Sequence, residues 1–331
     1  MTPPLHNFAG RSAVSHAFGL RRLSGHGAAL ALAALLVFNA AFTRDFLSAQ
    51  TLSVNLSQVA QVVIVAMGMT LVIATGGIDL SVGATASFAG TLAAVVLASA
   101  WAGMAPPAFA AALAIALAIA AACAFGLLNA TMVARYRIQP IVATLVLFIA
   151  GRGLAEMLTD GNLRTFPGGQ LDWLRARIGF LPVEGVVMAA VVLFTAWLVG
   201  ATVFGRRLLA TGGNERAAWL AGIPVTRVKA VAYLACAALA GLAGVMSVAM
   251  ISAADPAKIG LNLELNAIAA VAVGGTSLAG GRARVGGTLI GALVIQLLEY
   301  TLLAHGISDE YALMLKAAVI LLAVGLQRRG A

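Results

Sequence analysis

Few side chains in this 331-residue sequence could do chemistry, and one group of them follows a break between two apolar runs. Asp79 and Ser81 come directly after the glycine pair Gly76 and Gly77. Aspartate and serine are preferred at helix N-termini, where a side-chain oxygen accepts a hydrogen bond from a free backbone N–H. The alternative is that the glycine pair breaks a helix at membrane depth and that this break lines a pathway. The motif therefore predicts either a helix cap or the lining of a polar path.

A second group of polar side chains lies within the apolar runs. Asn129 and Thr144 could hydrogen-bond between neighbouring helices or face a solute. Arg152 and Glu156 are four residues apart, so they share one helix face and can pair. The alternative for them is an outer gate or a site for solute hydroxyls.

The last two apolar runs each carry one charge at the same distance from their connecting turn. Glu299 lies five residues before residue 304, and Lys316 lies five residues after residue 311. In an antiparallel hairpin these positions have equal depth, at a rise of 1.5 Å per residue. We predict that Glu299 and Lys316 form a structural ion pair.

The sequence offers no arrangement for bond-breaking chemistry. It has no cluster of metal-ligand residues, no nucleophile next to a base and no carboxylate pair at catalytic spacing, and His305 is expected to be solvated. A phosphate-cradling loop needs Gly-x-x-x-x-Gly-Lys, and none of the three lysines, Lys229, Lys258 and Lys316, follows a glycine. We predict that the chain is not an enzyme, binds no metal and does not hold ATP.

The composition identifies the class of protein that must position these residues. Sixty-one per cent of the residues are hydrophobic and 10% are charged, whereas soluble domains carry about 25% charged residues. The 36 glycines fit membrane helices, in which small residues let backbones approach closely. The net charge of +9 is scattered in small groups, which argues against a nucleic-acid partner. Cys123 and Cys236 lie within apolar runs, so we predict no disulfide.

Ten apolar runs approach the length of about 20 residues that a spanning helix needs. They cover residues 27–43, 56–75, 84–101, 107–133, 141–158, 185–203, 230–253, 265–279, 286–304 and 311–327. The runs are continuous rather than alternating, which excludes a barrel. The predicted fold is an all-α integral membrane protein, a polytopic bundle of about ten transmembrane helices with some of them broken.

The loop charges predict the orientation, because cytoplasmic loops are enriched in Lys and Arg. Placing both termini in the cytoplasm puts 14 basic residues of the loops and tails inside and five outside, and it puts most acids outside. Residues 1–26 are then a cytoplasmic tail, 27–327 the membrane domain and 328–331 a second tail. A cleaved signal peptide at the start is the weaker alternative. The two long loops are 159–184 outside and the basic loop 204–229 inside.

Several motifs resemble one family of membrane proteins. They are GMTLVIATGGIDLSVG at 68–83, LNA at 128–130, IQPIVATL at 138–145, RGLA at 152–155 and AVGGTSLAGGR at 272–282. In this order, and over most of residues 56–326, they resemble the permease subunits of ribose-type sugar ABC importers. The stretch 150–166 is most similar to the permease of a galactofuranose importer.

The inside loop extends the resemblance. Its residues Gly213, Asn214, Ala217, Ala218 and Gly222 are similar to the coupling helix with which importer permeases dock into an ATPase subunit. Gly222 could supply a left-handed helix cap. Arg216 stands where the family pattern has glutamate, so the polar contact to the ATPase is open. The plainer interpretation is an ordinary connector between spans.

The resemblance implies a permease that carries a monosaccharide across the bacterial inner membrane, driven by ATP hydrolysis on a separate subunit. ATP and Mg²⁺ would sit on that ATPase, and no cofactor on this chain. Further implied partners are a second permease, identical or homologous, a periplasmic sugar-binding protein and membrane lipid. The alternative is an ion-coupled secondary transporter or channel for a small polar solute. Candidate pathway residues are Gly76, Gly77, Asp79, Ser81, Asn129, Thr144, Arg152, Gly274 and Gly275.

Two glycine-rich segments are candidates for an internal repeat. Residues 76–83 and 274–281 both fit Gly-Gly-x-x-Leu-x-x-Gly, and each lies between two apolar runs. Paired glycine-interrupted segments are typical of transporter repeats. We predict that the two segments are structural equivalents, with chance similarity in a Gly-rich chain as the alternative.

Overall fold

The computed structural model describes residues 27–308 except 180, together with 310, 311, 313–315, 317 and 318. The predicted tails 1–26 and 328–331 lie outside the described residues. So do most of the predicted span 311–327 and Lys316, and with Lys316 its predicted pair with Glu299.

The described chain is helical, with four two-residue strands. Its helices are α2 (Gly27–Phe42), α3 (Ala49–Ala74), α4 (Val82–Leu97), α5 (Ala100–Met104), α6 (Pro107–Ala130), the π-helix η1 (Thr131–Arg135), α7 (Pro140–Met157), α8 (Asp172–Arg175), α9 (Val183–Ala201), α10 (Val203–Gly213), α11 (Glu215–Leu220), α12 (Val225–Ile251), α13 (Leu263–Val273) and α14 (Val285–Ala304). The strands β1 (Arg164–Thr165) and β4 (Ala253–Ala254) pair antiparallel, as do β2 (Arg177–Ile178) and β3 (Leu181–Pro182).

Nine of the ten predicted apolar runs each correspond to a helix of the bundle. Six helices of the described chain are long and apolar enough to cross a membrane: α3, α6 with η1, α7, α9, α12 and α14. The apolar helices α2, α4 and α13 are shorter, with 16, 16 and 11 residues. The shortness of α4 and α13 fits the predicted broken helices, because each lies beside one of the two glycine-rich segments.

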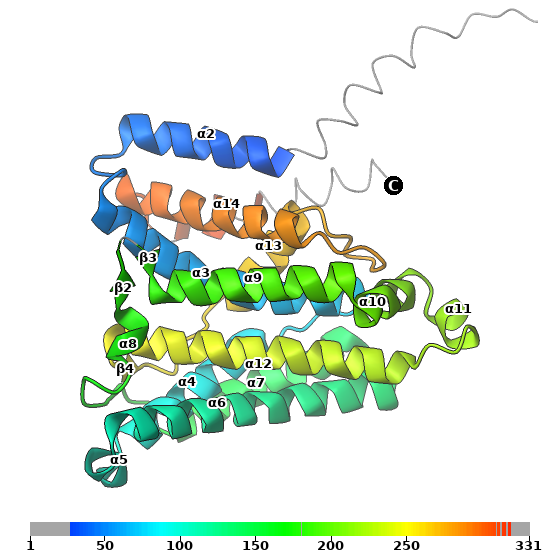
Figure 1. Ribbon diagram of the computed structural model, residues 1–331, viewed down its shortest axis with the longest axis horizontal. Coiled ribbons are helices and arrows are strands. Elements are labelled where there is room, and N and C mark those ends of the chain that lie inside the picture. The colour runs from blue at the N-terminus through cyan, green and yellow to red at the C-terminus, as the bar shows by residue number, and fades with distance from the viewer. Residues whose placement is uncertain (1–26, 180, 309, 312, 316, 319–331) are drawn as a thin grey trace, which may run out of the picture.

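The long helices lie side by side, and the two ends of the bundle differ (Figure 1). We call one the strand end, which carries β1–β4, α5 and α8, and the other the α11 end, which carries α10 and α11. Helix α3 lies in the middle, and 83% of its most apolar window is buried inside the protein. Residues 204–229, which the sequence predicts to be a basic loop, consist mostly of the helices α10 and α11.

Glycines let the central helices cross at backbone distance. A methyl group added at Gly68 of α3 would lie 2.8 Å from the Cα of Cys236 in α12, and one at Gly90 of α4 would lie 2.6 Å from the carbonyl oxygen of Gly244 in α12. Such small-residue crossings stabilise membrane helix pairs through close van der Waals packing. Cys236 is buried in this crossing, and both cysteines are free, in line with the prediction.

Helices α13 and α14 pack through a second glycine pair. Gly287 and Gly291 are four residues apart on α14, and a methyl group at either would overlap a backbone carbonyl of α13, that of Gly274 or of Ala270. This is the Gly-x-x-x-Gly pattern of close membrane-helix pairs. The Gly-x-x-x-Gly pattern is visible in the sequence, but sequence analysis did not identify it as a contact between two helices.

We predict that Gly287→Ala destabilises the protein by about 1–3 kcal/mol, the usual cost of overpacking. The matched control is Gly286→Ala one residue earlier, where an added methyl group meets nothing within 4 Å. The midpoint of thermal unfolding in detergent, followed for both variants, measures the difference. Equal midpoints for the two variants would show that α13 and α14 do not meet through Gly287.

Candidate functional site

The short helix α11 is built by local signals that the sequence carries. The Asn214 side chain caps its N-terminus, accepting a hydrogen bond from the Ala217 N–H at 2.9 Å. Gly222 ends it with a φ of +80°, a left-handed conformation that glycine adopts without strain. The N–H groups of Gly222 and Ile223 donate to the carbonyls of Trp219 and Ala218, which completes a Schellman cap. The predicted left-handed cap at Gly222 is confirmed.

Helix α11 exposes an apolar tip. Ala218 is buried, whereas Ala217 is exposed, and the side chains of Trp219 and Leu220 are 67% and 71% exposed. In Figure 1, α11 projects beyond the ends of the long helices. An exposed apolar patch at the end of a bundle, rather than along its flanks, is typical of a protein–protein contact.

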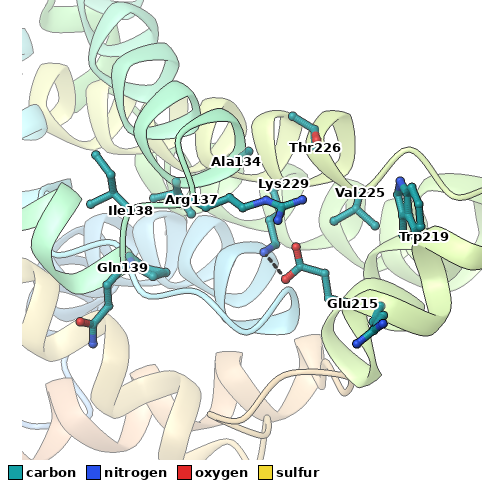
Figure 2. A pocket seen from close by; sticks show the side chains of 12 residues that line it. Ala134, Arg137, Ile138, Gln139, Glu215, Trp219, Val225, Thr226 and Lys229 are labelled. Atoms are coloured by element: carbon teal, nitrogen blue, oxygen red, sulfur yellow. Dashed lines mark hydrogen bonds and ion pairs between the residues drawn. The ribbon is translucent and has the colours of Figure 1, made fainter.

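Beside α11 lies an open hollow of about 670 Å³ (Figure 2). One wall is residues 133–140, from η1 to the start of α7, and the other is α11 with the start of α12. Arg137, Arg216 and Lys229 bring positive charge, and Glu215 holds Lys229 at 2.6 Å. The hollow therefore favours an acidic partner. Sequence analysis missed it as a site, although both walls come from basic loops.

The end of α10 joins α11 to the broken helix α3. A methyl group at Gly212 would overlap the carbonyl oxygen of Ala74, the last residue of α3, and lie 2.6 Å from the Gly281 nitrogen. That nitrogen donates to the same Ala74 carbonyl at 3.0 Å. Gly280 also packs on the backbone of Gly76 and Gly212. This glycine junction, residues 74–76, 212–213 and 280–281, brings α10 and both glycine-rich segments into backbone contact.

The two glycine-rich segments end their helices in the same way, with a shift of one residue. Gly76 has a φ of +83°, and Gly76 and Gly77 donate to Ile73 and Val72. Gly275 has a φ of +81°, and Gly275 and Thr276 donate to Ala272 and Val271. Gly76 therefore corresponds to Gly275 rather than to Gly274, so the alignment of 76–83 with 274–281 is one residue out of register. Gly274 instead packs on Gly287, as described above.

The predicted polar residues after the break come together in a buried cluster. The Asp79 carboxylate accepts hydrogen bonds from the N–H and hydroxyl of Ser81, at 2.9 and 2.6 Å. The Asn129 amide donates to Ser81 Oγ at 2.8 Å and to Asp79 Oδ1 at 3.3 Å. Asp79, Ser81 and Asn129 are each at most 1% exposed. Thr144 Oγ1 accepts from the Leu80 N–H at 3.1 Å.

This cluster fastens the start of α4 to two neighbouring helices, α6 through Asn129 and α7 through Thr144. Of the two interpretations that the sequence left open for Asn129 and Thr144, the contacts fit hydrogen bonding between helices. Irregular backbone at this depth is tolerated when it is buried in protein, and residues 77–81 meet that condition through these bonds. The Tyr233 hydroxyl and Asn129 Oδ1 are buried without a partner among the described residues.

Arg152 fastens a different loop. Its guanidinium donates to the carbonyls of Pro256, Ile259 and Gly260, at 3.2, 2.8 and 2.9 Å. Among the described ion pairs none joins Arg152 to Glu156, so the predicted pair is wrong. The loop that precedes α13 supplies three carbonyls to the guanidinium of Arg152. The Glu156 carboxylate would have to displace them in order to pair with it.

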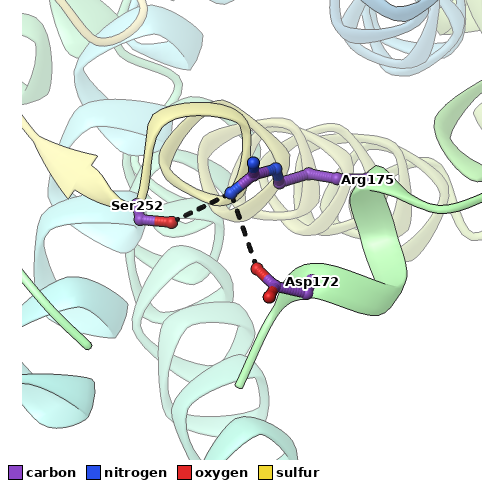
Figure 3. Close-up of polar contacts among 3 residues, drawn as sticks. All are labelled: Asp172, Arg175 and Ser252. Atoms are coloured by element: carbon purple, nitrogen blue, oxygen red, sulfur yellow. Dashed lines mark hydrogen bonds and ion pairs between the residues drawn. The ribbon is translucent and has the colours of Figure 1, made fainter. Parts of the chain in front are cut away.

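At the strand end, polar contacts involve residues of 159–184, which the sequence predicts to be an outside loop. Arg175 of α8 donates to Asp172 at 3.5 Å and to the hydroxyl of Ser252 at 3.2 Å (Figure 3). Ser252 stands in a left-handed conformation directly before β4, which pairs with β1. These contacts join the loop to the end of α12.

Comparison with known proteins decides between a transporter subunit and a structural bundle. A family model described as branched-chain amino acid transport system, permease component, matches residues 52–324. The chain belongs to this permease family. The permease is therefore a multi-pass transport subunit rather than an enzyme, as predicted. Among its described residues no group of three His, Cys, Asp or Glu side chains could hold a metal ion.

Several curated relatives cover nearly the whole permease. It is 38% identical over 300 residues to the ribose import permease protein RbsC of Escherichia coli (strain K12), covering 89% of this chain and 91% of the relative. It is 39% identical over 306 residues to RbsC of Bacillus subtilis (strain 168), covering 92% of both. The galactofuranose transporter permease protein YtfT of Escherichia coli (strain K12) is 39% identical over 269 residues, covering 80% of this chain and 76% of the relative. No solved structure matches the permease.

Proposed function

We propose that this permease is the membrane subunit of an ATP-driven importer that carries a monosaccharide across the inner membrane of a bacterium. The observation that carries the proposal is α11, a capped helix with an exposed apolar tip beside a basic hollow. This is the form expected of a helix that inserts into a groove of an ATPase subunit, where ATP and Mg²⁺ would bind. In this assignment Gly213, Asn214, Ala217, Ala218 and Gly222 shape the coupling element.

The proposed orientation puts the α11 end in the cytoplasm. The basic residues of 135–137, 206–229 and 282–284 all belong to that end, which agrees with the enrichment of Lys and Arg in cytoplasmic loops. The strand end then faces the periplasm, where a sugar-binding protein would dock. With about ten spans, both termini would lie in the cytoplasm, and a second permease, identical or homologous, would complete the pathway within the lipid.

The apolar tip of α11 gives the direct test. We predict that Leu220→Arg reduces ATPase binding and sugar-stimulated ATP hydrolysis by at least tenfold, because it places a charge in the centre of a desolvated contact. The variant should fold normally, since the Leu220 side chain is 71% exposed. The measurement is ATP hydrolysis by the reconstituted permease–ATPase complex, with and without loaded binding protein.

One variant controls this test. Leu220→Met keeps an apolar side chain of similar size and should retain activity. Normal coupling in Leu220→Arg would mean that α11 is not the docking element. A chain that never associates with an ATPase would instead move the ion-coupled secondary transporter to the front.

The proposed substrate class follows from the relatives, whose names specify ribose and galactofuranose. The family description names branched-chain amino acids, so these are the second candidate. Uptake by the complex of D-ribose, D-galactose and leucine, each offered with its own binding protein, distinguishes the two. Uptake of leucine alone would reject the sugar assignment, but it would still agree with the assignment as an importer.

A further inference from the structure

Two glutamines meet near mid-depth of the spanning helices. Gln296 lies eleven residues after the start of α14 and eight before its end, or about 17 and 12 Å at 1.5 Å per residue. Its Nε2 donates to Oε1 of Gln58 in α3 at 3.3 Å. The two amides therefore sit together at a depth where hydrocarbon would otherwise surround them.

The pair is accessible from outside the bundle. Gln58 is exposed and Gln296 half-buried. On α9 the exposed side chains at a similar depth are apolar, with Leu193 70% and Phe194 59% exposed. A surface that faces lipid is expected to be apolar, like this part of α9, because a polar group without a partner in hydrocarbon costs several kcal/mol.

One bond cannot satisfy two amides. Each primary amide has two N–H donors and a carbonyl that accepts twice. Within the part of the chain that the structure describes, the bond between the two side chains uses one donor and one acceptor. Both N–H groups of Gln58 and the carbonyl of Gln296 are left for water or a solute.

A cavity adjoins the pair. It has a volume of about 200 Å³, and Asn55 and Gln296 contribute its polar groups, among apolar residues that include Phe46 and Leu293. Asn55 Oδ1 is buried and has no partner among the described residues. Drug-sized ligands occupy pockets of about 300–1,000 Å³, so this cavity suits a smaller molecule.

We propose that Gln58, Gln296 and Asn55 form a binding site for a neutral polyhydroxyl solute along the transport path. Amides both donate to and accept from hydroxyl groups, and none of the residues that line the cavity is charged. A zwitterionic amino acid would need charged partners, which a buried site must supply to offset desolvation. The inference rests on the proposed function and selects the sugar over the amino acid.

Thiol accessibility tests the site. Gln58→Cys and Gln296→Cys are each made in a chain with Cys123→Ala, so that the buried Cys236 is the remaining native thiol. The assembled transporter in membranes is treated with a charged, membrane-impermeant thiol reagent. We expect both cysteines to react at least tenfold faster than Leu193→Cys, the exposed control at matched depth. Rates equal to that control would overturn the proposal, because both faces would then meet lipid.

A second arm tests the ligand class. Saturating D-ribose, supplied with its binding protein, should slow the labelling of Gln58→Cys at least threefold, whereas leucine should not. Protection by leucine alone, or by neither compound, would overturn the hydroxyl site. If the complex of the native chain shows no stimulated ATP hydrolysis while Gln58→Cys still reacts quickly, the proposed function is rejected and the polar site is retained.

Discussion

Gly212→Ala is expected to reduce ATP-driven uptake more than tenfold. The added methyl group would overlap the Ala74 carbonyl and press on the Gly281 nitrogen, so α10 must move away from the end of α3. The hydrogen bond from the Gly281 N–H to the Ala74 carbonyl would be strained at the same time. Since α10 continues directly into α11, motion of the docking helix would no longer reach the two glycine-rich segments.

A glycine outside the junction is the control for this prediction. Gly200 of α9 is exposed, and a methyl group there meets nothing within 4 Å, so Gly200→Ala should transport at close to the native rate. Initial uptake rates in proteoliposomes are normalised to the amount of monodisperse permease recovered from size-exclusion chromatography. Equal rates for Gly212→Ala and Gly200→Ala would show that the glycine junction does not transmit the motion.

Asn129→Leu is expected to destabilise the permease by about 1–3 kcal/mol, the usual cost of leaving a buried polar group without its hydrogen-bond partner. The substitution removes the amide that donates to both Ser81 and Asp79, and it leaves the buried carboxylate with Ser81 as its donor. The start of α4 would also lose its tie to α6.

A double-mutant cycle separates this contact from a general packing defect. Asp79→Ala removes the acceptor group, so the loss caused by Asn129→Leu should shrink by more than 0.5 kcal/mol, the usual limit of additivity, in that background. Thr131→Val is the matched control, because Thr131 is exposed and its hydroxyl bonds its own helix. Strictly additive losses in unfolding free energy would contradict the coupling between Asn129 and Asp79.

Much of the architecture could be predicted because the membrane imposes it locally. Nine helices lie where the predicted apolar runs lie, and six of the nine are long and apolar enough to cross a membrane. A helix is the expected form because a backbone in hydrocarbon must satisfy its own hydrogen bonds. Two helix ends were equally predictable, because Asn214 and Gly222 act within a few residues of their own positions. The glycine-rich segments also predicted the breaks after α3 and α13, although the predicted alignment of the two segments is one residue out of register.

The partners of the polar residues could not be predicted in the same way. Asp79 meets Asn129, 50 residues away, and Arg152 meets carbonyls more than 100 residues away, instead of the carboxylate on its own helix. Gln58 and Gln296 are two of several polar residues in two mostly apolar runs, and only packing places them together at the surface. The sequence alone determined which segments form apolar helices, because apolar length is a local property. The tertiary structure decided which polar groups bond to one another inside the bundle and which reach its surface, because that choice depends on how distant helices pack.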